Sequence, residues 1–264
     1  MLSLKTTLTI LMSLTLVGCL ASSISQTNNQ SPKTGFNIPI QEITINKKTY
    51  LVATINPDIF QLTIFENNQS PDSLNIKQVK ENTKSELAFN GSFYNKEFTP
   101  LGLLISKGKL LYPLTKSQLM NGVLTINQKN TPSLFTSQEF QDKQKTLLPE
   151  IDFAIQAGPI LLDAQGKIMI DKSNSKNAGR TAMGLDKEGK IILIMLRQTL
   201  LNHENTQTLY DFAQTISTSP EFTNLGLNSV INLDGGNSSG LAGKDKYFPE
   251  LEKVQNIILV NPRT

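Results

Sequence analysis

The stretch 230-VINLDGGNSSG-240 contains the strongest signal for how this chain folds. It begins with apolar and β-branched residues, which are typical of a buried strand, and then passes into one carboxylate, two glycines, an amide and two hydroxyls. Glycine adopts backbone conformations that other residues avoid, and it lets main-chain N–H groups approach a bound group closely. The pattern therefore predicts a buried strand that ends near Asp234 in a polar turn.

Short β-rich segments occur throughout the rest of the chain. Two turn signals, at 106–109 and 186–190, place glycine where a hairpin needs a positive φ, so each is expected to join antiparallel neighbours. Sheet therefore dominates, and the expected fold class is α+β, with a largely antiparallel or mixed sheet and a few packed helices. The expected strands lie in 43–57 (two, turning at 46–48), 61–67, 86–90, 101–106, 122–127, 152–158, 189–197, 229–234 and 255–260.

Helices are predicted in two places. The segment 205–216 has a helical apolar stripe and Asn205 or Thr206 as its expected N-cap. That stripe predicts core packing, and its members are Leu209, Phe212, Ala213 and Ile216. A second helix is expected at 137–148. No internal repeat or change of composition after residue 36 indicates a second domain, so 37–264 is expected to form one domain.

The N-terminus has the pattern of an export signal. A cation at Lys5 precedes an apolar run that is too short to span a bilayer, which predicts a removable signal peptide at 1–18. The ending Leu-Val-Gly-Cys resembles a bacterial lipoprotein box, which implies lipidation of Cys19, while an ordinary signal peptide with an incidental cysteine is the alternative. Residues 19–36 are expected to form a flexible tether. The protein is thus expected to be exported and membrane-anchored, in the periplasm on the outer membrane if the cell is Gram-negative, as Leu20 indicates.

Composition excludes several classes of protein. The 264-residue chain is 38% hydrophobic and 18% charged, so it can bury a sizeable core. Its net charge is only +3 and its cations are scattered, so no nucleic-acid partner is expected. Cys19 is the only cysteine and His203 the only histidine, so the chain has neither an internal disulfide nor the ligands of a conventional zinc site.

Four stretches combine glycine with polar groups at expected strand ends, namely 89–102, 156–161, 177–184 and 231–239. Taken singly, each is explained by an ordinary turn. Together they predict an anion site, because Arg180 offers a forked donor that matches a phosphate and glycines expose main-chain amides. We expect the amides near Gly235 and Gly236 to help bind that phosphate, with Asp234 directed at another atom of the ligand.

The motifs N-G-x-F…P-x-G, G-P, R-T-A-x-G and N-L-D-G-G-x-S-S, which span 89–241, resemble the phosphodiester glycosidase family. The resemblance implies a hydrolase that cleaves the glycosidic bond of sugar-1-phosphodiesters. Ser92 and Asn237 stand where relatives often have glycine, which implies a different pocket floor. The positions that match the family motifs are Asn90, Gly91, Phe93, Gly102, Gly158, Pro159, Arg180, Thr181, Gly184, Asp234, Gly235, Gly236, Ser238 and Ser239.

The chemistry of such a substrate needs little acid catalysis. Most glycosidases use two carboxylates, one of which protonates the leaving group, whereas a phosphate monoester leaves easily. Asp234 is therefore predicted to be the base or nucleophile and Arg180 the phosphate clamp. The substrate is expected in envelope or extracellular glycans. The predicted substrate-binding residues are Asn90, Gly91, Phe93, Gly158, Thr181, Gly235, Gly236, Asn237, Ser238 and Ser239, of which Asn90 and Ser238 are expected to position the sugar or phosphate.

Three alternatives stay open from sequence. A serine hydrolase would need a base near a serine such as Ser238, but His203 is expected in a polar surface loop. A divalent cation, Ca²⁺ or Mg²⁺, would use oxygens of Asp234, Asn90 and Asn237. The third alternative is an envelope lipoprotein that binds glycans or phosphoglycans without turnover.

Overall fold

The computed structural model describes residues 36–67, 73–172, 176–196 and 205–263. The predicted signal peptide, Cys19, nearly all of the predicted tether and His203 lie outside the described residues. Within the described ranges, none of the helices has the length and apolar character needed to span a bilayer. The described residues belong to one compact unit, Phe36–Thr264.

The largest sheet has six strands in the order β1-β2-β12-β11-β13-β10, and each of its pairs is antiparallel. The hairpin predicted at 186–190 joins β11 to β12, as expected. The bounds are β1 Ile40–Ile45, β2 Lys48–Ile55, β10 Ile160–Leu162, β11 Arg180–Asp186, β12 Ile191–Leu196 and β13 Leu227–Asn232.

Two five-stranded antiparallel sheets complete the architecture, in the orders β15-β14-β4-β16-β3 and β6-β5-β9-β7-β8. The first contains β3 Phe60–Glu66, β4 Leu87–Asn90, β14 Leu241–Ala242, β15 Tyr247–Phe248 and β16 Asn256–Pro262. The second contains β5 Leu104–Ser106, β6 Lys109–Tyr112, β7 Gly122–Asn127, β8 Pro132–Thr136 and β9 Ile151–Ala157. The α+β, mainly antiparallel fold class is therefore confirmed.

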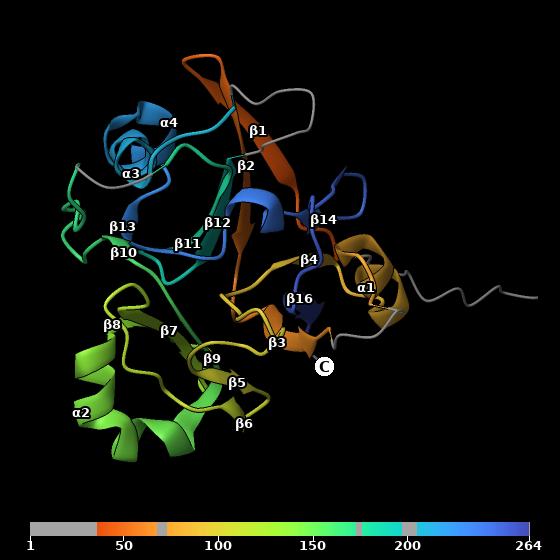
Figure 1. The fold of residues 1–264 in the computed structure, drawn as a ribbon, viewed down its shortest axis with the longest axis vertical. Helices are drawn as coiled ribbons and strands as arrows, with labels where there is room; N and C mark the ends of the chain where they lie inside the picture. The colour runs from red at the N-terminus through yellow and green to blue at the C-terminus, as the bar shows by residue number, and fades with distance from the viewer. Residues whose placement is uncertain (1–35, 68–72, 173–175, 197–204, 264) are drawn as a thin grey trace, which may run out of the picture. The chain divides into compact units, whose positions relative to one another are not determined.

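Each longer helix covers a different sheet (Figure 1). Helix α1 (Ile76–Thr83) contacts β4 and β14, α2 (Ser137–Leu147) contacts β7 and β8, and α3 (Leu209–Thr218) contacts β10. A short helix α4 (Pro220–Thr223) packs on α3, and 3₁₀ turns occur at Leu148–Glu150 and Gly236–Ser238. These helices bury their apolar faces against sheets, which leaves the polar strand ends to form the site.

The strand β12 shows where the core lies. Its residues alternate between two apolar clusters, so that Leu193 and Met195 join one and Ile192 and Ile194 the other. Covering on both faces explains why the strand is a continuous apolar run instead of an alternating one. On the second face, Phe212 of α3 stacks on the fully buried Tyr50 with ring centroids 6.2 Å apart.

The start of α3 differs from the prediction. The helix runs Leu209–Thr218, and its N-cap is Thr208, whose hydroxyl accepts a hydrogen bond from the Asp211 N–H at 3.0 Å. Asn205 does not cap the helix, because its side chain pairs with both main-chain groups of Thr49 instead. The predicted helix at 137–148 is confirmed as α2, whereas α1 was not predicted.

Candidate active site

A pocket of about 540 Å³ lies at the polar ends of three strands. It is lined by Arg180 of β11, by Asn232 of β13 and by Phe93 of the loop after β4. The predicted anion clamp, Arg180, and the predicted catalytic acid, Asp234, both line it, although they are 54 positions apart (234 − 180). Four other predicted binding residues line it too, namely Phe93, Gly158, Gly235 and Gly236. Six do not: Asn90, Gly91, Thr181, Asn237, Ser238 and Ser239.

The main-chain N–H, the carbonyl and the carboxylate of Asp234 each form a hydrogen bond within the protein. Its N–H donates to the Gly91 carbonyl at 3.2 Å, and its own carbonyl accepts from the Asn90 side chain at 2.7 Å. The Gly235 N–H donates to its Oδ1 at 2.9 Å. Burial raises the pKa of Asp234 to about 6, and the nearby negative charge of Glu252 adds to this, while hydrogen bonds from Ser238 and Gly235 oppose it. The carboxyl therefore changes protonation near neutral pH.

Arg180 is the first residue of β11 and is only 9% exposed. Its Nε donates to the Gln207 carbonyl at 2.9 Å, and its Nη2 donates to the Lys176 carbonyl. Burial lowers the pKa of Arg180 to about 10, which leaves the guanidinium charged at neutral pH. Among the described residues, no carboxylate forms an ion pair with it. Within the described part of the chain, these carbonyls use two of its five N–H donors and no acid neutralises its charge.

The turn after Asp234 packs directly against the strand that bears Arg180. The Gly236 N–H donates to the Gly179 carbonyl at 2.8 Å, and a Cβ on Gly235 would lie 2.9 Å from the same oxygen. Glycine at 235 is therefore required by this close approach. In this structure the Gly235 and Gly236 N–H groups both donate inside the protein, to Asp234 Oδ1 and to the Gly179 carbonyl, so the binding of a phosphate by amides near these glycines stays a prediction.

Asn90 lies behind the pocket as the centre of a buried network. Its side chain is 0% exposed, and its Oδ1 accepts from the Thr181 hydroxyl at 3.0 Å and from the Gly240 N–H at 3.2 Å. The Thr181 hydroxyl oxygen also lies 3.0 Å from the Ser239 hydroxyl oxygen. The network joins the ends of β4 and β11 to the main chain of Asp234. The network therefore fixes the main chain of Asp234.

The same network bears on the cation alternative. A ligand set of Asp234, Asn90 and Asn237 is not assembled, since the Asn90 oxygen already accepts two hydrogen bonds and the Asn237 side chain is exposed. No group of three or more His, Cys, Asp or Glu side chains within the described part of the chain is arranged to hold a metal ion. These side chains do not fit an oxygen-only cation site.

Asn256 is a buried side chain that the sequence did not single out. Its amide pairs with both main-chain groups of Ser92, accepting from the N–H at 2.7 Å and donating to the carbonyl at 3.1 Å. Gly91 allows this, because a Cβ there would lie 1.9 Å from the Asn256 Oδ1. The available signal was an asparagine at the start of the apolar strand β16. Gly91 thus supports the site through packing.

Asn232 and Glu252 were also missed. The Asn232 side chain donates to the Gly158 carbonyl at 2.9 Å and lines the pocket, two residues before Asp234. Glu252 is exposed, and its Oε1 accepts a hydrogen bond from the buried Ser238 hydroxyl at 3.0 Å. A glutamate between Leu251 and Lys253 has no distinguishing pattern, so sequence alone could not find it.

One wall of the pocket is apolar. Its residues come from the loop after β4, from the connection between β6 and β7, and from the start of α3. They are Phe93, Tyr94, Leu101, Leu119, Met120 and Leu209. Leu119 is 77% exposed, so it lies at the mouth. The pocket therefore combines a cation, an acid and an apolar surface.

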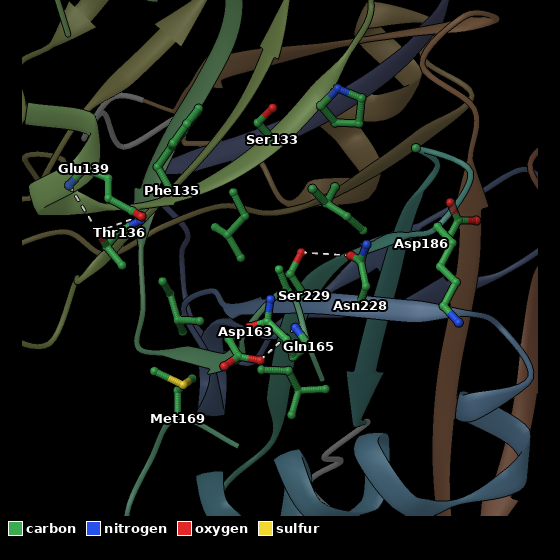
Figure 2. Close-up of a pocket in the computed structure, with 18 residues that line it drawn as sticks. Ser133, Phe135, Thr136, Glu139, Asp163, Gln165, Met169, Asp186, Asn228 and Ser229 are labelled. Carbon is green, nitrogen blue, oxygen red and sulfur yellow. Dashed lines mark hydrogen bonds between the residues drawn. The ribbon is translucent and has the colours of Figure 1, made fainter. Parts of the chain in front are cut away.

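A second pocket, of about 670 Å³, is shown in Figure 2 and contains none of the predicted site residues. Its acids are engaged locally: Asp163 accepts from the Gln165 and Lys167 N–H groups. Glu139 accepts from the N–H and hydroxyl of Thr136 as part of the cap of α2. These acids serve turns and caps, so the pocket offers less chemistry than the first.

Comparison with solved structures shows the same fold in three proteins. The catalytic domain of zebrafish N-acetylglucosamine-1-phosphodiester alpha-N-acetylglucosaminidase, auto-inhibited by pro-peptide, has a TM-score of 0.60 and 18% identity, covering 86% of this chain and 83% of that one. A hypothetical protein from Synechocystis has a TM-score of 0.55 and 16% identity, covering 85% and 61%. A putative exported protein from Burkholderia pseudomallei K96243 has a TM-score of 0.52 and 13% identity, covering 81% and 74%.

Sequence comparison identifies the family. A search of curated proteins found no significant match. The profile of the phosphodiester glycosidase family, by contrast, matches residues 83–261 of the 264-residue chain, a range that includes every residue lining the pocket. This protein therefore belongs to the phosphodiester glycosidase family.

Proposed function

We propose that this protein hydrolyses the glycosidic bond of sugar-1-phosphodiesters and releases a sugar and a phosphomonoester. The observation that carries the proposal is that Arg180 and Asp234 line one pocket while neither is neutralised by the other. A buried cation and a carboxylate held apart in this way can each act on a different part of one substrate.

Arg180 is suited to the phosphate. Its unused N–H groups can donate to phosphate oxygens, and their stabilisation increases as negative charge develops on the leaving group. The carbonyls of Gln207 and Lys176 hold the guanidinium in place, so little reorganisation is needed when the bond breaks. A leaving group stabilised in this way needs no proton from a second acid.

Asp234 is suited to the anomeric carbon. With a pKa of about 6 it is ionised at neutral pH and still basic enough to accept a proton. As a base it would remove a proton from water while the water oxygen bonds to the anomeric carbon. The bond from that carbon to the phosphate oxygen then breaks, and its electron pair leaves with the phosphate. As a nucleophile the carboxylate would form that new bond itself, and water would later release the sugar.

The apolar wall is suited to the face of a sugar ring. The aromatic side chains of Phe93 and Tyr94 line the pocket, and a sugar ring or its substituents could pack against them. The structural similarity to the zebrafish N-acetylglucosamine-1-phosphodiester alpha-N-acetylglucosaminidase supports the same substrate class here.

We further propose that the protein acts at a membrane surface, on envelope or extracellular glycans. This rests on the export-signal pattern and on the lipoprotein-like ending at Cys19. Labelling cells with a radioactive fatty acid tests it, since the full chain should be labelled and the Cys19→Ser variant should not. Release of both proteins into the soluble fraction without label would contradict the anchor.

Hydrolysis of a sugar-1-phosphodiester in ¹⁸O-labelled water tests the activity. A glycosidase breaks the C–O bond, so the label should appear in the sugar and be absent from the phosphomonoester. Label in the phosphate would identify a phosphodiesterase instead. Binding of the diester with no release of sugar would favour the non-catalytic, phosphoglycan-binding alternative.

A further inference from the structure

A phosphodiester has a third part besides its sugar and its phosphate. The phosphate carries a second substituent, on the side away from the sugar. In the proposed function the anomeric carbon lies at Asp234 and the phosphate at Arg180, which line one pocket. The rest of the lining of that pocket therefore indicates the chemistry of the second substituent.

Apolar side chains lie beside Arg180. Its Nε donates to the Gln207 carbonyl at 2.9 Å, and the main chain of Gln207 pairs with that of Ala178. Leu209 follows Gln207 by two residues, at the start of α3. Ala178 and Leu209 both line the pocket. The surface next to the predicted phosphate position is therefore aliphatic.

The mouth of the pocket is aliphatic as well. Leu119 is 77% exposed there, and Met120 and Pro159 line the same pocket. The Leu119 main chain packs closely on Gly158, because a Cβ on that glycine would overlap the Leu119 carbonyl. Covering an exposed leucine with an apolar group is favourable. A substituent longer than the pocket would leave it past this leucine.

The polar side chains of the pocket leave little capacity for further hydroxyl groups. Among the described residues of the lining, the Tyr94 hydroxyl and the Asn232 amide donate to main-chain carbonyls, at 2.7 and 2.9 Å. The Ser117 hydroxyl accepts from a main-chain N–H at 3.1 Å. A glycerol or a second sugar beside the phosphate would bury hydroxyl groups with few partners, which costs free energy. Burying CH₂ groups there is favourable instead.

We propose that the second substituent of the phosphate is aliphatic, so that the substrate is a sugar joined through one phosphate to an alkyl or isoprenoid chain. The inference rests on the proposed function and adds the class of the leaving group. Water bonds to the anomeric carbon, the bond from that carbon to the phosphate oxygen breaks, and an alkyl phosphate leaves with the electron pair. Arg180 binds its phosphate, and Leu209 and Leu119 contact its chain.

Diesters that share one sugar test the inference. N-Acetylglucosamine 1-phosphate would be used as its methyl, propyl, glyceryl and hexyl esters, and initial rates of sugar release would be measured. The propyl ester should exceed the glyceryl ester in kcat/KM by about tenfold or more, because the two differ only in hydroxyl groups. Each further CH₂ group that is buried should raise kcat/KM about fourfold. Equal values for propyl and glyceryl, or a fall with chain length, would refute the inference.

Two variants test where the chain lies. Leu119→Ser and Leu209→Ala should each lower the ratio of kcat/KM for the hexyl ester to that for the methyl ester by about three- to tenfold. This ratio is taken within one preparation, so a fraction of unfolded protein does not alter it. Leu110→Ser is the matched control, because Leu110 is 51% exposed on β6 and is not among the described residues that line the pocket. It should keep the parent ratio, and a parent ratio in both test variants would contradict the proposal.

Binding of the expected product separates this inference from the function on which it depends. Hexyl phosphate should bind the parent about tenfold or more tightly than glyceryl phosphate, as measured by calorimetry. If the parent releases sugar but prefers aliphatic groups in neither rate nor binding, the inference is refuted and the function stands. If the parent releases sugar from none of the diesters, the function is refuted and the inference falls with it. A preference for the aliphatic group in both measurements supports both.

Discussion

Arg180 and Asp234 line one pocket without forming an ion pair. The pKa of Asp234 is raised by burial, whereas close contact with a guanidinium would lower it. The two charged groups therefore lie farther apart than the partners of an ion pair. This relationship distinguishes the pair from a structural salt bridge and is the basis for the predictions below.

The acidic limb of the pH–rate profile should report Asp234. If the ionised carboxylate is the base or nucleophile, kcat/KM should fall about tenfold for each pH unit below about 6. Initial rates between pH 4 and 9 would measure it. A rate that instead falls as pH rises through about 6 would show that Asp234 acts as the acid.

Replacing Asp234 with Asn should remove activity and stabilise the fold. The folded-state pKa of about 6 lies above the unfolded value of 3.8, so the favourable contribution of this carboxyl is present below 3.8 and is lost as pH rises through 6. Asn carries no charge, so at pH 8 the variant should be more stable by about 1–3 kcal/mol. Urea unfolding at pH 4 and pH 8 measures the difference, which should nearly vanish at pH 4. Equal stability at both values would contradict the burial of this charge.

Replacing Arg180 with Lys should weaken phosphate recognition. Lysine keeps the charge but loses the planar fork that bonds to the Gln207 and Lys176 carbonyls. We expect kcat/KM to fall about 10²–10³-fold, as when one donor to a developing oxyanion is removed. Inorganic phosphate should inhibit the parent more strongly than the variant. Arg263→Lys removes a guanidinium that does not line the pocket, and it should leave kcat/KM unchanged.

Replacing Asn90 with Ala should cost stability. The change leaves the Asp234 carbonyl, the Thr181 hydroxyl and the Gly240 N–H without a shared partner. The free energy of unfolding should fall by about 2–4 kcal/mol, measured by urea titration. Thr181→Val is the milder comparison, and its free energy of unfolding should fall by about 1 kcal/mol. If Asn90→Ala kept its stability and lost only substrate binding, the direct substrate contact predicted from sequence would be supported instead.

Replacing Gly235 with Ala should separate the turn from β11. The added Cβ would lie 2.9 Å from the Gly179 carbonyl, which belongs to the main chain and cannot move aside easily. We expect a loss of about 1–3 kcal/mol in stability and a lower kcat. Thermal melting and initial rates measure the two effects. An unchanged kcat would show that the spacing of Arg180 and Asp234 tolerates this shift.

Much of the fold could be predicted because most of its long strands bury regular patterns, although the seven-residue β11 was not among the expected strands. The hairpins at 106–109 and 186–190 form as expected, and β12 lies within the predicted segment. Short strands such as β14 and β15, of two residues each, have too few positions for a pattern to appear. The start of α3 was missed because Asn205 has a tertiary partner, Thr49, that local propensity cannot reveal.

The sequence predicts site residues whose side-chain chemistry is distinctive. It does not predict features that depend on which groups the fold brings together. Arg180 and Asp234 could be paired from their motifs, and they line one pocket. The availability of the Gly235 and Gly236 amides depends on which carbonyl faces them, and no sequence pattern records that. Glu252 lies beside Ser238 because the connection between β15 and β16 is hydrogen-bonded to the Asn237 carbonyl, so its position depends on tertiary contacts.

The hydrogen bond from Gly236 to Gly179 has a consequence for which substrates fit. It joins the acidic turn to the residue before the arginine strand through main-chain atoms, so moving the two charges apart to admit a longer molecule would break this bond. A sugar joined through one phosphate spans a shorter distance than the same sugar joined through a diphosphate, as in nucleotide sugars. The protein should therefore discriminate by linkage length, even between substrates that carry the same sugar.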